Sequence, residues 1–113
     1  MAIPYEPSSV GETLVGQGQF TTAVTATQIA AGVVVVKAAS GRLAKILVTT
    51  ATTASQAITV YDNASAGSGT VIAIIPGSST AGTVVDFQMP CANGITIAQN
   101  ASLAAGGITI SWV

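Results

Sequence analysis

Charged residues are scarce in this sequence, and histidine is absent from it. Only 6% of the 113 residues are charged, against about 25% in an ordinary soluble domain. Enzymes need groups that transfer protons, attack a substrate or bind a metal, and a freely dissolved monomer needs a charged surface. The composition therefore predicts a protein that is not an enzyme and whose surface is largely covered by partners. The charged residues are Glu6, Glu12, Lys37, Arg42, Lys45, Asp62 and Asp86.

Groups for covalent or metal chemistry are equally few. Cys91 is the only cysteine, and without a histidine there is neither a base to ionise it nor a serine triad. The segment Asp62–Gly67 begins like a calcium-binding loop, but alanines stand at ligand positions and the closing glutamate is missing. We therefore predict no catalytic residue, no metal site and no cofactor. Asp62 is instead expected to cap its own turn, facing Lys45 or Arg42.

A membrane span, a targeting segment and a basic patch are also missing. Mean hydropathy is high, at +0.67, but the longest apolar run, Ile29–Val36, is much shorter than the roughly 20 residues that cross a membrane. The N-terminus lacks the basic and apolar regions of a signal peptide. The three basic residues are too few to neutralise a nucleic-acid backbone. The sequence predicts no membrane, nucleic-acid or small-molecule partner.

The chain does contain short runs of Val, Ile and Thr, separated by clusters of Gly, Ser and Asn. This pattern is typical of β-strands and turns, and no segment is long enough for a βαβ crossover helix. It predicts an all-β antiparallel sandwich or barrel over residues 20–113, with about eight strands, after an extended N-terminal arm over residues 1–19. The expected strands are Phe20–Thr27, Val33–Ala38, Leu43–Thr50, Ala57–Asp62, Thr70–Pro76, Thr83–Met89, Gly94–Gln99 and Gly107–Val113.

Some of these strands are apolar on both faces. The residues of Val33–Val36 and Val71–Ile75 do not alternate between apolar and polar, and an antiparallel strand of this kind must be covered on both sides. The cover is either the arm, a loop or another subunit, so we expect a homo-oligomer. The arm packs either on its own domain or against a neighbour. The expected interface residues are Ile3, Tyr5, Val10, Leu14, Val34, Val36, Ile72 and Ile74.

Several segments resemble a family of small phage virion structural proteins of the capsid decoration or cement kind. The most specific is Val60–Ser65, with the sequence Val-Tyr-Asp-Asn-Ala-Ser. The resemblance implies a jelly-roll β-sandwich that coats a viral capsid, often as a trimer. The implied partners are further copies of the chain and the major capsid protein, and the implied location is the virion surface after synthesis in the host cytoplasm. The resembling segments are Gly41–Val48, Ile58–Ser65, Gly69–Ile72, Ala92–Ile97 and Ile108–Val113.

The function that follows from this resemblance is stabilisation of the assembled phage head. A protein that binds only the assembled shell stabilises that state by mass action. One alternative is a tail, fibre or baseplate subunit with the same fold. Another is a carbohydrate-binding, lectin-like module, because jelly rolls also serve as lectins. In that case Trp112 would stack on a sugar, although its place at the end of an apolar stripe favours the core.

Overall fold

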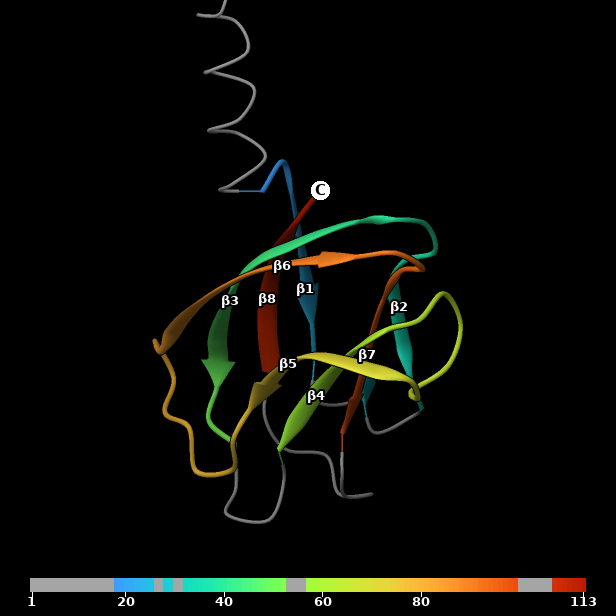
Figure 1. The fold of residues 1–113 in the computed structure, drawn as a ribbon. Coiled ribbons are helices and arrows are strands. Elements are labelled where there is room, and N and C mark those ends of the chain that lie inside the picture. Colours follow the sequence, from blue (N-terminus) through green and yellow to red (C-terminus); the bar gives the residue numbers. More distant parts are fainter. Residues whose placement is uncertain (1–17, 26–27, 30–31, 53–56, 100–106) are drawn as a thin grey trace, which may run out of the picture.

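The strands of the protein match the sequence pattern closely. The computed structural model describes residues 18–25, 28–29, 32–52, 57–99 and 107–113 (Figure 1). Every expected strand is present with small shifts at its ends, so the prediction of an antiparallel all-β protein with about eight strands is confirmed. The arm lies outside the described residues, apart from its last two. The strands are β1 (Phe20–Val24), β2 (Val34–Lys37), β3 (Gly41–Thr50), β4 (Ile58–Asp62), β5 (Thr70–Ile75), β6 (Val84–Cys91), β7 (Ile95–Gln99) and β8 (Gly107–Trp112).

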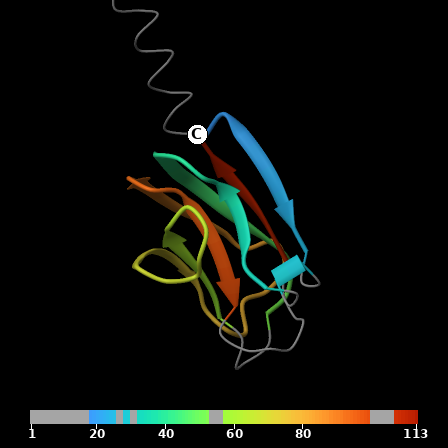
Figure 2. The same ribbon diagram turned by 90° about the vertical axis from the view of Figure 1, so that its right-hand side faces the viewer.

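The strands form two four-stranded sheets that lie face to face (Figure 2). Sheet A has the order β1-β8-β3-β6, and sheet B has the order β2-β7-β4-β5. The first strand pairs with the last, the second with the seventh, the third with the sixth and the fourth with the fifth. Two more antiparallel pairs, β3 with β8 and β4 with β7, join these ribbons into sheets. The chain therefore folds like one long hairpin whose paired arms wrap into two layers.

The core between the sheets is built from isoleucine, valine and leucine. In β8, Ile108 and Ile110 are fully buried, whereas Thr109 between them and Ser111 after them face outward. This alternation is what the period of two along a strand requires. Each fully buried isoleucine contributes about 1.5–3 kcal/mol by removing apolar surface from water. The core side chains are Val24, Ile29, Leu43, Ile46, Val48, Ile58, Val60, Ile72, Ala73, Ile75, Cys91, Ile95, Ile97, Ile108 and Ile110.

A bulge in β5 decides which of its side chains face outward. The register pairs Val60 with Ala73 and then Tyr61 with Val71, so β5 carries an extra residue at Ile72. A bulge lets two successive residues on one strand oppose a single partner residue. Ile72 and Ala73 are consequently both buried, while the residues on either side of them are exposed.

The connection between β1 and β2 contains a helical turn at Gln28 and Ile29. Its start is a reciprocal cap: Gln28 Oε1 accepts from the Thr25 N–H at 2.8 Å, and the Gln28 N–H donates to Thr25 Oγ1 at 3.2 Å. This is the arrangement of a capping box. It fixes the turn so that the Ile29 side chain joins the core.

Trp112 packs against the core at one end of sheet A. Its ring centroid lies 4.9 Å from that of Phe20, and its Nε1–H donates to Thr22 Oγ1 at 3.0 Å. The ammonium group of Lys37, from sheet B, lies 5.7 Å from the ring centroid, within the range of a cation–π contact. The indole therefore connects the two sheets, and part of its surface is already in contact with other side chains of the protein.

Candidate interaction surface

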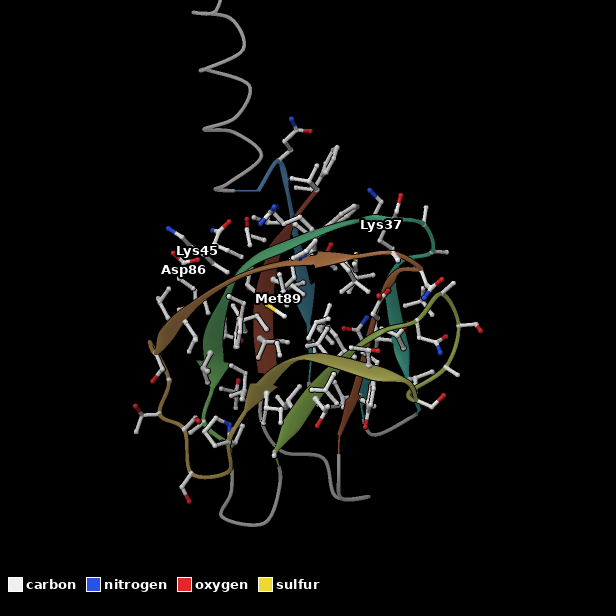
Figure 3. The ribbon with its side chains drawn as sticks, viewed as in Figure 1. Lys37, Lys45, Asp86 and Met89 are labelled. Atoms are coloured by element: carbon white, nitrogen blue, oxygen red, sulfur yellow. The ribbon has the colours of Figure 1, made fainter. Side chains whose placement is uncertain are left out.

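The charged residues of sheet A point outward. Its strands contain Arg42, Lys45 and Asp86, which alternate with side chains that face the core. Lys45 and Asp86 are direct cross-strand neighbours and lie side by side (Figure 3). The Arg42 Nη1–H donates to the Gln88 carbonyl at 2.9 Å. The outer face of sheet A therefore carries both signs of charge.

The charged residues of sheet B turn inward instead. Its strands contain Lys37, at the end of β2, and Asp62, at the end of β4. Lys37 reaches across to Trp112 of sheet A. Asp62 accepts hydrogen bonds from the turn that leads from β6 of sheet A to β7 of sheet B. Among the described residues, the strands of sheet B thus present no charged side chain on their outer face.

That outer face is an apolar surface crossed by two rows of neighbouring side chains. The register places Val35 beside Thr96, Thr96 beside Tyr61, and Tyr61 beside Val71. The second row runs through Ala98, Thr59 and Ile74. We call this surface the apolar face; it consists of Val33, Val35, Thr59, Tyr61, Val71, Ile74, Thr96 and Ala98.

The large side chains at the two edges of the apolar face are exposed, whereas Thr59 and Thr96 at its centre are buried. Ile74 is 52% exposed, and Val33, Val35 and Val71 are each exposed by more than 40%. On the outer face of sheet A, the exposed apolar pair Val84 and Leu47 lies next to the Lys45–Asp86 pair. The two faces therefore differ more in charge than in apolar content.

The loop between β4 and β5 borders the apolar face. Asn63 Oδ1 accepts from the N–H groups of Ser65 (2.9 Å) and Ala66 (2.8 Å), and Asn63 Nδ2–H donates to the Ser68 carbonyl (3.0 Å). These bonds form an Asx-type turn. A Cβ on Gly67 would lie only 2.9 Å from the Ala98 Cβ, so a glycine is needed where this loop rests on the sheet.

Asp62 corrects one of our expectations, because its carboxylate does not cap its own turn. Its oxygens accept from three successive backbone N–H groups: Ala92 at 3.0 Å, Asn93 at 2.7 Å and Gly94 at 3.2 Å. The hydrogen bonds from Ala92 and Asn93 lower the pKa of this carboxyl group, since they stabilise its charged form. We call this arrangement the Asp62 clamp. It ties the end of β4 to the turn between β6 and β7.

The predicted interface residues fall in three different places. Ile3, Tyr5, Val10 and Leu14 lie outside the described residues. Ile74 is exposed on the apolar face. Val34 and Val36 are partly buried and pack against the core, and Ile72 is 5% exposed within it. The surface position expected for Ile72 is wrong, because the bulge in β5 turns this side chain inward.

Sequence reasoning missed Val33, Val35, Tyr61 and Val71 as members of this surface. A run of consecutive valines has no polar residue to mark which side faces water. The cross-strand register supplies that information, since each residue faces the same side as its partner. Val35 pairs with Thr96, which lies on the opposite side of β7 from the core residues Ile95 and Ile97.

The remaining reactive groups do not gather into a site. Cys91 is buried, and this burial raises the pKa of its thiol. In the part of the chain that the structure describes, no group of three or more His, Cys, Asp or Glu residues is placed to hold a metal ion. Within the same residues, no helix has the length and hydropathy needed to span a bilayer. Comparisons with protein-family models, with curated proteins and with solved structures found no match for this chain.

Proposed function

We propose that the protein is a non-enzymatic virion structural protein, a decoration or cement subunit that binds the assembled phage head through its apolar face. The observation that carries this proposal is the outer face of sheet B, where four large apolar side chains are exposed and the described strands place no charged side chain on the same face. These side chains lie at the β2 and β5 edges of the sheet, on either side of its covered centre, and exposed apolar side chains grouped on one face favour an interaction site. The resemblance of Val60–Ser65 and the other segments to phage virion proteins supports the same assignment.

We also propose that the sandwich is a jelly roll. The support is the strand pairing, in which partners are first with last, second with seventh, third with sixth and fourth with fifth. Rolling a long antiparallel hairpin into two layers produces this pairing, and eight-stranded jelly rolls occur in viral capsid proteins. Fold alone does not assign function, so the pairing supports the proposal only together with the apolar face.

The size of the apolar face indicates how the protein would attach. Four strands about 4.8 Å apart, each contributing about five residues at roughly 3.3 Å per residue, span about 300 Å², and the covered centre at Thr59 and Thr96 leaves less than this exposed. A stable pairwise interface buries about 800 Å² on each partner. The apolar face alone therefore supports weak binding, and firm attachment needs additional contacts. The arm over residues 1–19 and the presence of many neighbouring sites on one shell are the proposed sources of these contacts.

The proposed partners are further copies of this chain, as a trimer, and the major capsid protein, on the outer surface of the virion. A subunit that binds the assembled shell and not its dissociated parts stabilises the shell by mass action. Because the apolar face has no charge, this binding should depend only weakly on ionic strength.

Two measurements test the proposal. The first is the number of copies of the protein in purified particles, and the second is the binding of variants to shells that lack the protein. We expect copy numbers in a fixed ratio to the major capsid protein, and shell binding that is lost in Ile74→Lys. Val84→Lys is the matched control, because Val84 is an exposed valine on the outer face of sheet A. Only a few copies per particle would instead assign the protein to a tail or baseplate. Equal binding of both variants and the wild type would show that the apolar face takes no part in attachment to the shell.

A further inference from the structure

Asn93–Gly94 is a chemically labile pair in an exposed turn. In an Asn–Gly sequence, the backbone nitrogen of the glycine can attack the side-chain carbonyl carbon of the asparagine. The nitrogen–carbon bond forms, the bond to the amide nitrogen breaks, and ammonia leaves with the proton of the glycine N–H. Water then opens the succinimide ring to aspartate or isoaspartate. Asn93 is exposed, and the other asparagines, Asn63 and Asn100, both precede alanine, whose side chain slows this attack.

The fold requires glycine at this position. A Cβ on Gly94 would clash with the Lys37 carbonyl oxygen, and it would lie 2.7 Å from the Asn63 carbonyl oxygen. Both obstacles are backbone atoms of neighbouring segments, so a flexible side chain cannot move aside to make room. The labile pair is therefore kept by packing, because a bulkier residue that would slow the reaction does not fit.

The Asp62 clamp acts on the atoms that would react. The attacking nitrogen is that of Gly94, and its N–H donates to Asp62 Oδ1 at 3.2 Å. The adjacent N–H groups of Asn93 and Ala92 donate to the same carboxylate at 2.7 and 3.0 Å. Successive N–H groups of this kind form a concave anion site, and hydrogen bonds to a charged acceptor are strong.

Two consequences follow for the reaction. The attack requires the Gly94 nitrogen to rotate toward the Asn93 side chain, and three hydrogen bonds oppose this rotation. The attack also requires the nitrogen to lose its proton, and a neighbouring carboxylate makes the resulting negative charge less favourable. Asp62 remains charged at neutral pH, so both effects persist under ordinary conditions.

We propose that Asn93 is a latent deamidation site and that the Asp62 carboxylate protects it by holding the Gly94 N–H. Once formed, isoaspartate at position 93 lengthens the backbone by one carbon atom and places a second carboxylate beside Asp62. Neighbouring like charges repel, so the modified turn should not form its hydrogen bonds to Asp62 again. Deamidation would therefore release the link between β4 and the β6–β7 turn irreversibly. This proposal is independent of the proposed function.

The test is to incubate the intact protein at mildly alkaline pH and to measure deamidation of Asn93 by peptide mapping and mass spectrometry. Asn63 and Asn100 serve as internal references. We expect Asp62→Asn, which removes the charge and keeps the shape, to deamidate about tenfold faster than the wild type, since losing about 1.4 kcal/mol changes a local opening equilibrium by that factor. Asp86→Asn is the matched control and should keep the wild-type rate. An unchanged rate in a folded Asp62→Asn variant would overturn the proposal.

A measurement on the wild type keeps the proposal testable if Asp62→Asn does not fold. Hydrogen exchange of the Gly94 amide should be strongly slowed in the native protein, and Asn93 in the chemically unfolded chain should deamidate at least tenfold faster than in the native chain. A rapidly exchanging Gly94 amide, or equal deamidation rates in the native and unfolded chains, would show that the clamp does not protect this site.

Discussion

The outer faces of the two sheets contain similar side chains but differ in charge. Sheet A exposes Val84 and Leu47 next to Lys45 and Asp86. Sheet B exposes valines and isoleucine alone, because the charges of its strands are directed at Trp112 and at the β6–β7 turn. In a chain with so few charged residues, the direction of two side chains changes the character of a whole surface.

The largest effect is expected from Gly94→Ala, because Gly94 packs directly against the backbone of two neighbouring segments. The added Cβ would meet two backbone carbonyl oxygens, so we expect a loss of about 3 kcal/mol or more in the free energy of unfolding. Urea denaturation measures this loss. Gly67→Ala is the comparison, because its Cβ would meet only side-chain carbons, the Ala98 Cβ at 2.9 Å and the Val33 Cγ1 at 3.0 Å, and we expect a smaller loss there. A Gly94→Ala loss no larger than that of Gly67→Ala would contradict the packing argument.

The next effect is expected from Asp62→Ala, which removes the clamp itself. Hydrogen bonds to a charged group contribute about 1.5–3 kcal/mol, and we expect a loss of about 2 kcal/mol at neutral pH. The folded pKa of Asp62 is depressed below 3.8, so its contribution is complete above that value and disappears as the pH falls through the folded pKa. The stabilities of the variant and the wild type should therefore converge in acid. A difference that stays constant down to the lowest accessible pH would show that the charge is not involved.

A smaller effect on folding is expected when a charge is placed on the apolar face. Ile74→Lys should change the free energy of unfolding by about 0.5 kcal/mol or less, as is usual for exposed positions, and it should weaken self-association. Val84→Lys should leave self-association unchanged. Sedimentation velocity over a range of concentrations measures both. Stronger or equal self-association in Ile74→Lys would mean that copies of the chain meet through another surface.

The smallest effect is expected from Asp86→Asn on the outer face of sheet A. The residue is exposed and is the cross-strand neighbour of Lys45, and even a formed ion pair at an exposed position contributes only about 0–1 kcal/mol. Thermal unfolding should show a change within about 0.5 kcal/mol of the wild type. A loss comparable with that of Asp62→Ala would show that an outward charge on sheet A stabilises the fold as much as the Asp62 clamp does.

Local pattern was enough to predict the strands of this protein. Runs of Val, Ile and Thr between Gly, Ser and Asn clusters located each strand to within a few residues, because the pattern depends only on neighbours along the chain. Trp112 was expected in the core and packs against it. The candidate surface was harder to predict. The valine run of β2 correctly indicated two apolar faces, but Val34 and Val36 were chosen where Val33 and Val35 face outward.

The sequence by itself determined the all-β class, the approximate strand positions and the scarcity of charge. Only the tertiary structure decided which side of the non-alternating strands β2 and β5 faces water, since that depends on cross-strand register and on the extra residue at Ile72. It alone decided the role of Asp62 as well, whose partners at Ala92, Asn93 and Gly94 lie about thirty residues away in the chain. The physical reason is the same in both cases: a period-two pattern shows that faces alternate, but only contacts between distant segments show which face is covered.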